Sequence, residues 1–152
     1  MIEVVRSAEF AAGPEQVWAV VADARRVPDW FSLAERTEVV SGAGEGEKRR
    51  QHADWGGKRA EIDQTVIAFE PGRLIAWKHT AERVDGLPAP KYAKSSVFRV
   101  ELESAGTTTT VTLRLRQEPV SALHGIMMRF GTRQLVRRME ESLVRLAGAI
   151  DG

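Results

Sequence analysis

Histidines are the first residues to consider for chemistry, because imidazole serves as a metal ligand and as a general base near neutral pH. The chain has three, His52, His79 and His124, and none forms the paired spacing that is typical of zinc sites on one helix. The sequence contains no cysteine, which excludes disulfides, thiolate nucleophiles and thiolate metal ligands. We therefore expect no metal site and no cofactor.

His79 is the histidine best placed for a role in a site. Two-residue alternation puts it on the same strand face as Ile75 and Trp77, and an apolar face of that kind points inward. There it can orient the carbonyl or hydroxyl group of a ligand, or act as a general base. The simpler interpretation, which we favour, is a hydrogen-bonded wall residue, since histidine is commonly half-buried.

Three carboxylates, Asp54, Glu61 and Asp63, offer acid–base chemistry but alternate with apolar residues. That pattern predicts the solvated outer face of a sheet. The sequence has no nucleophile elbow, phosphate-binding loop or dinucleotide fingerprint. Covalent catalysis and nucleotide binding are therefore unsupported, and no catalytic residue is assigned.

The segment from Glu47 to His52 reads as a strand of unusual polarity. Arg49 and Gln51 share one face of it, so an inward face would bury polar groups. A buried arginine without a partner is very costly. Either an inward arginine meets a carboxylate of the protein or of a ligand, or the strand lies at a sheet edge with both faces wet. We favour the edge position, with ligand anchoring as the alternative.

Composition limits the class of protein. The chain has 152 residues, of which 43% are hydrophobic and 28% charged, which is typical of one soluble domain spanning residues 1–152. The formal net charge of +1 argues against a large electrostatic binding surface for nucleic acid or an acidic membrane, so no nucleic-acid partner is expected. No signal peptide and no run of about 20 apolar residues is visible, so we expect a cytoplasmic protein without a transmembrane segment.

Turn signals divide the chain into short strands. Strands are predicted at residues 2–10, 37–40, 47–55, 59–69, 74–81, 95–103 and 107–117. Strands joined by such short glycine-rich or proline-rich turns form an antiparallel meander. Two short helices are expected after the first strand, one starting at Pro14 and one opening at Asp29 and ending near Ala34.

The sheet needs a cover, because the last two strands each have one apolar face. Residues 121–150 contain no proline and supply it. The apolar residues of this segment recur at helical spacing; they are Leu135, Met139, Leu143, Leu146 and Ile150. Gly131 weakens the helix, and we predict a kink or break there.

Particular residues carry a family resemblance. Residues 11–18 (AAGPEQVW), Asp23 and residues 28–30 (PDW) resemble the opening of the START-like, helix-grip or SRPBCC superfamily, in its polyketide cyclase/dehydrase and lipid-transport branch. Residues 70–77 (EPGRLIAW) are similar to the family's turn and following strand. The resemblance covers essentially the whole chain, although the matching residues are core and turn residues rather than catalytic ones.

The resemblance implies an α+β helix-grip fold, a curved seven-stranded antiparallel sheet with two short helices and a long C-terminal helix. It also implies a cavity between sheet and helix that binds or transports a small hydrophobic ligand, such as a lipid, a quinone or a polyketide-like compound. The alternative is a polyketide cyclase/aromatase-like enzyme, in which His79 or Arg49 polarises a carbonyl of the bound substrate. Fold alone does not decide between the two.

The expected cavity wall combines inward strand residues with residues of the long helix. The candidate ligand-binding residues are Trp55, Trp77, His79, Phe98, Val100, Leu113, Leu115, Met127, Phe130 and Leu135. Trp18 and Trp30 are assigned to the core. The resemblance implies that the loop of residues 82–92 closes over the cavity mouth, and the alternative is a plain hairpin connection. A third interpretation is a protein-interaction module with a basic helix surface, which the charge balance disfavours. Monomer and homodimer both remain open.

Overall fold

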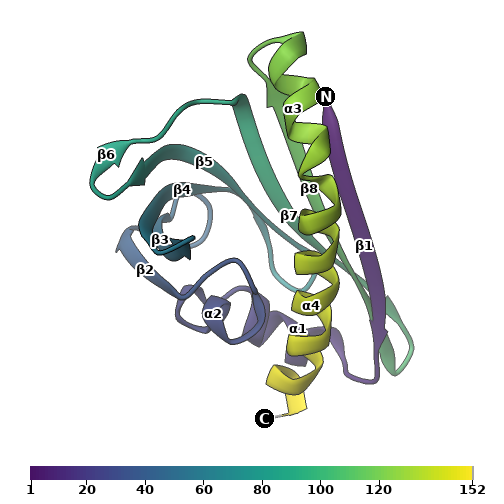
Figure 1. Ribbon diagram of the computed structural model, residues 1–152. Helices are drawn as coiled ribbons and strands as arrows, with labels where there is room; N and C mark the ends of the chain where they lie inside the picture. Colours follow the sequence, from purple (N-terminus) through teal and green to yellow (C-terminus); the bar gives the residue numbers. More distant parts are fainter. Residues whose placement is uncertain (152) are drawn as a thin grey trace.

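The computed structural model describes residues 1–151 as a strongly curved antiparallel sheet whose hollow side is covered by helices (Figure 1). The strands run in the order β1-β8-β7-β5-β4-β3-β2, with the short β6 paired to β5. Their bounds are β1 Ile2–Phe10, β2 Arg36–Ser41, β3 Lys48–Trp55, β4 Lys58–Glu70, β5 Leu74–Val84, β6 Leu87–Pro88, β7 Ala93–Ala105 and β8 Thr108–Pro119. The predicted meander and helix-grip architecture are confirmed.

The helices lie before β2 and after β8. Their bounds are α1 Pro14–Val21, the 3-10 turn η1 Ala24–Arg26, α2 Val27–Trp30, α3 Ala122–Phe130 and α4 Thr132–Asp151. The second short helix ends earlier than the predicted Ala34, because Phe31 already has extended backbone angles. The predicted break is confirmed, since Gly131 separates α3 from α4. Within residues 1–151, no helix is long and apolar enough to cross a membrane.

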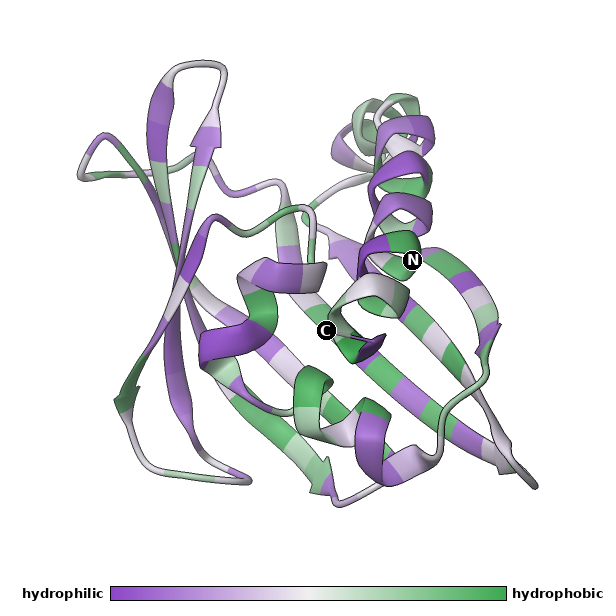
Figure 2. Cartoon of the chain, turned by 90° about the horizontal axis from the view of Figure 1, so that it is seen from below, coloured by the Kyte–Doolittle hydropathy of each residue, from purple (hydrophilic) through white to green (hydrophobic). Residues whose placement is uncertain are grey.

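Alternation along β7 and β8 builds the core. Phe98, Val100 and Leu102 are buried on β7, as are Val111 and Leu113 on β8, while their neighbours in sequence face outward. Figure 2 shows this alternation as green and purple bands along the strands behind the long helix. Residues of α4 close the core at helical spacing; Met139, Leu143 and Leu146 are buried. Burial of these apolar side chains is the main force that holds helix to sheet.

Strand β3 corrects one prediction. It lies between β2 and β4, so it is not an edge strand. Two of its inward residues, Arg49 and Gln51, are polar, and the Arg49 side chain is only 1% exposed. The guanidinium pairs with the Glu47 carboxylate, donates a hydrogen bond of 2.9 Å to the Ala22 carbonyl and lies over the Trp77 ring. The structure therefore shows the other alternative, in which an inward arginine meets a carboxylate of the protein.

The carboxylates of β4 lie on the outer face of the sheet in an ion-pair network. Arg83 contacts both Glu61 and Asp63, and Arg50 donates to Asp63 at 2.9 Å. The hydrogen bonds from Arg83 and then Arg50 lower the pKa of Asp63 from 3.8 to about 2. Asp54 accepts a hydrogen bond from the Gly57 amide in the β3–β4 turn. Glu61 and Asp63 are therefore paired with arginines on the outer face of the sheet, where the sequence predicted them.

Candidate functional site

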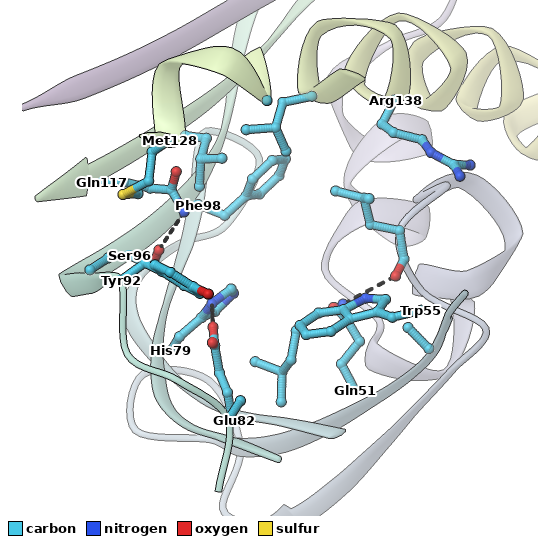
Figure 3. A pocket seen from close by; sticks show the side chains of 18 of the residues that line it. Gln51, Trp55, His79, Glu82, Tyr92, Ser96, Phe98, Gln117, Met128 and Arg138 are labelled. Atoms are coloured by element: carbon cyan, nitrogen blue, oxygen red, sulfur yellow. Dashed lines mark hydrogen bonds and ion pairs between the residues drawn. The ribbon is translucent and has the colours of Figure 1, made fainter. Parts of the chain in front are cut away.

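A cavity of about 910 Å³ lies between the hollow face of the sheet and the helices that cover it. Its floor comes from β5, β7 and β8, and Met128, Gly131 and Leu135 line it from the helical side (Figure 3). The cavity exists because the sheet curves away from α3 and the start of α4, whereas α1 fills the space at the other end of the sheet. A space of this size matches the usual range for small-molecule pockets.

The cavity floor is aromatic. Trp77 on β5 and Phe98 on β7 are paired in the sheet register, and their rings stack at a centroid distance of 5.2 Å. Phe31, which follows α2, packs on Phe98 at 4.9 Å. All three side chains are buried. Such a floor offers a large rigid apolar surface to a bound molecule.

Ser96 and Gln117 form a polar pair on the wall. They face each other across β7 and β8, and Gln117 Nε2 donates to Ser96 Oγ at 3.0 Å. The Ser96 hydroxyl keeps its own proton to donate. Sequence reasoning missed both residues, yet the signal was present: Ser96 is two residues before Phe98, and Gln117 two after Leu115, on the same inward alternation.

His79 contributes a second polar group and is oriented by Glu82. The distance from His79 Nδ1 to Glu82 Oε1 is 3.2 Å, and both residues line the cavity. A carboxylate can only accept, so Nδ1 carries the proton in this contact and Nε2 is left as an acceptor in the neutral ring. Figure 3 shows Tyr92 beside this pair.

Gln51 faces His79 from across the cavity (Figure 3). Its carbonyl accepts from Gln64 Nε2 at 3.0 Å, and its amide donates to the Leu33 carbonyl at 3.4 Å. The two buried glutamines therefore hold each other in place on β3 and β4. Arg138 of α4 also lines the cavity, on the same side as Gln51. The wall thus has polar groups on two sides and apolar surface between them.

The structure brings most of the predicted wall residues together. Those that line the cavity are Trp55, Trp77, His79, Phe98, Leu115 and Leu135. Val100 and Leu113 are fully buried in the core and do not line the cavity. Met127 and Phe130 are exposed on the outer side of α3, because the helical turn brings Met128 to the cavity instead.

The structure also shows where Arg49 and the segment of residues 82–92 lie relative to the cavity. Arg49 does not line the cavity, since its contacts hold it in the core. The segment of residues 82–92 is a hairpin rather than a long loop, because β5 continues to Val84 and pairs with β6. Glu82, Lys91 and Tyr92 from this segment lie on the cavity wall.

Comparisons with known proteins agree with this architecture. A family model described as "Polyketide cyclase / dehydrase and lipid transport" matches residues 1–151. No curated protein is significantly similar to the chain.

Among solved structures, a START superfamily protein from Mycobacterium smegmatis matches with a TM-score of 0.75 and 16% identity, covering 98% of this chain and 97% of that one. MLL2253 from Mesorhizobium loti matches with a TM-score of 0.72 and 18% identity, covering 99% and 97%. TTHA0849 from Thermus thermophilus matches with a TM-score of 0.70 and 18% identity, covering 98% and 97%. At these identities the likeness is one of fold.

Proposed function

The chain belongs to the polyketide cyclase/dehydrase and lipid transport family, and we propose that it binds a small, mostly apolar molecule between its sheet and helices α3 and α4. The observation that carries this proposal is the cavity of about 910 Å³ with an aromatic floor. Apolar burial against Trp77, Phe98 and Phe31 would supply most of the affinity. Sequestration or transport of the molecule is the corresponding activity.

The polar groups of the wall narrow the ligand class. Ser96 and His79 lie on one side of the cavity and Gln51 on the other, so hydrogen bonds are offered at two places. Each of these groups already has a partner within the protein but keeps a further donor or acceptor, which a hydrocarbon would leave unused, at a cost. A lipid, quinone or polyketide-like compound that carries oxygen atoms would pair with them.

Filling the cavity tests the proposal. Ala53 on β3 lines the cavity and is 7% exposed, so Ala53→Phe should place a ring inside it. We expect the affinity for the apolar fluorescent probe anilinonaphthalene sulfonate to fall at least about tenfold, in keeping with the loss of one well-buried contact surface. The measurement is a fluorescence titration of the full chain.

The matched control is Ala105→Phe, which adds the same ring at an exposed position at the end of β7. This variant should bind the probe as the original chain does. Equal probe affinity for Ala53→Phe and the original chain would refute binding in the cavity.

One observation favours a second candidate function, an enzyme that cyclises a bound polyketide-like substrate. The contact between His79 and Glu82 at 3.2 Å is the arrangement of a general base and the group that orients it. With a linear poly-β-ketone thioester as substrate, turnover should fall about a hundredfold or more in His79→Ala. Probe affinity should stay nearly unchanged in that variant. Absence of turnover by the original chain would remove this candidate and leave the binding proposal intact.

A further inference from the structure

Helix α3 carries an apolar stripe that nothing in residues 1–151 covers. Ile126, Met127 and Phe130 lie three, four and seven residues after Leu123, which places all four on one helix face. Their exposed fractions range from 51% for Met127 to 85% for Phe130. No residue of α3 is buried. Four large apolar side chains on one exposed helix face are typical of an interaction surface.

Basic residues continue this stripe. Arg133 and Arg137 lie three and seven residues beyond Phe130, in the first turns of α4 after the break at Gly131, and Arg129 adjoins Phe130 on α3. All three are exposed. The acidic residues near them in sequence are engaged elsewhere: Glu140 pairs with Arg6, and Glu141 pairs with Arg138 and Arg145. The three arginines form no salt bridge within residues 1–151 and are available to an anionic partner.

We propose that α3 docks onto an anionic lipid surface. An apolar helix face bordered by arginine is the pattern of helices that lie in the membrane interface, with the apolar side chains at the acyl boundary and the arginines at the headgroups. The position of α3 suits this role, because it lies at one end of the molecule, away from the C-terminus (Figure 1). The net charge of only +1 means that the apolar stripe must supply most of the binding.

A second copy of the chain fits this surface less well. A stable protein interface engages roughly 20–30 residues on each side, far more than the stripe offers. A two-fold contact also places the same patch on both partners. Such an interface would contain the unpaired arginines of both copies, with no carboxylate of the stripe to pair with them.

Docking would place the lipid surface beside the cavity. Met128 on the inner side of α3 and the adjoining Gly131 both line the cavity. A molecule leaving the bilayer would therefore need to pass only one helix to reach it. This exchange rests on the proposed function, whereas docking itself does not, and the two are tested separately.

Vesicle flotation with the full chain tests the docking. The probes are phosphatidylcholine vesicles and vesicles in which about a quarter of the lipid is phosphatidylserine. We expect binding to the anionic vesicles, and a loss of at least about tenfold in the double variant Ile126→Ser/Phe130→Ser, since two apolar anchors are removed. Arg133→Gln/Arg137→Gln should weaken binding to the anionic vesicles severalfold, and added salt should do the same to the original chain.

The matched control is Val39→Ser/Val40→Ser, which removes two exposed apolar side chains from β2, far from α3 (Figure 1). This variant should bind vesicles as the original chain does. Three outcomes would overturn the proposal: no binding to either vesicle, equal binding by the Ile126→Ser/Phe130→Ser variant, or dimers that this variant abolishes without any vesicle binding. The four residues replaced by serine are all exposed, so thermal unfolding followed by circular dichroism should be the same for the two serine double variants.

Discussion

Replacing Glu47 with alanine is expected to lower the free energy of unfolding by about 3 kcal/mol, the usual loss when one partner of a buried ion pair is removed. The Arg49 side chain is 1% exposed and that of Glu47 is 14% exposed. Without the carboxylate, the guanidinium keeps the Ala22 carbonyl at 2.9 Å and the Trp77 ring at 5.6 Å. Neither carries a countercharge, and the buried guanidinium cannot turn to water.

A set of three variants separates the cost of an unpaired charge from the loss of a contact. Arg49→Met should cost less than Glu47→Ala, because the remaining Glu47 carboxylate is near the surface and methionine fills the vacated volume. The double variant should recover most of the stability lost in Glu47→Ala. Urea unfolding measures all three. If Glu47→Ala proves no more harmful than Arg49→Met, the protein carboxylate is not what compensates the buried arginine.

Replacing Trp77 with alanine is expected to lower the free energy of unfolding by about 3–5 kcal/mol, the range for losing a large buried aromatic side chain. Trp77 is 1% exposed, stacks on Phe98 and meets the edge of Phe31. Its loss would remove the middle of the cavity floor and the ring beneath Arg49. Urea unfolding gives the stability change, and the probe titration gives its effect on the cavity.

Trp77→Phe is the matched control. Phenylalanine keeps a ring on Phe98, and it also removes the Trp77 indole N–H, which is buried without a hydrogen-bond partner among residues 1–151. An unpaired buried donor costs about 1–3 kcal/mol, so the phenylalanine variant should lose far less stability than the alanine variant. Equal losses in the two variants would contradict this account of the floor.

The sequence predicted the strands well where one face of the sheet is exposed to solvent and the other is buried, because polar and apolar side chains then alternate. Strands β7 and β8 follow this rule, and Gly131 divides the C-terminal helix as its low helix propensity predicts. The same rule gave a wrong prediction for β3, because Arg49 and Gln51 on its inward face resemble the polar residues of a solvent-exposed face. Of the groups that keep Arg49 buried, Glu47 is local, but the Ala22 carbonyl lies 27 positions away in sequence, and no local pattern indicates that contact.

The cavity wall was predictable only in part. Alternation correctly placed Trp77, Phe98 and Leu115 on the cavity wall, but it predicted the same for Val100 and Leu113, which are buried in the core. Alternation tells which face of the sheet a residue is on, but not where along that face the cavity lies. Helix α3 is a harder case, since it buries no residue. Met128 packs against the core from α3, but a single partly buried residue gives no apolar periodicity from which the orientation of the helix could be predicted.

Native mass spectrometry of the protein purified from its own host tests the central claim most directly. The account predicts a population heavier than the polypeptide by the mass of one small molecule, which denaturation releases and which the Ala53→Phe variant lacks. A protein that carries the polypeptide mass alone, or an added mass that Ala53→Phe retains in full, would contradict the claim that this cavity holds a ligand.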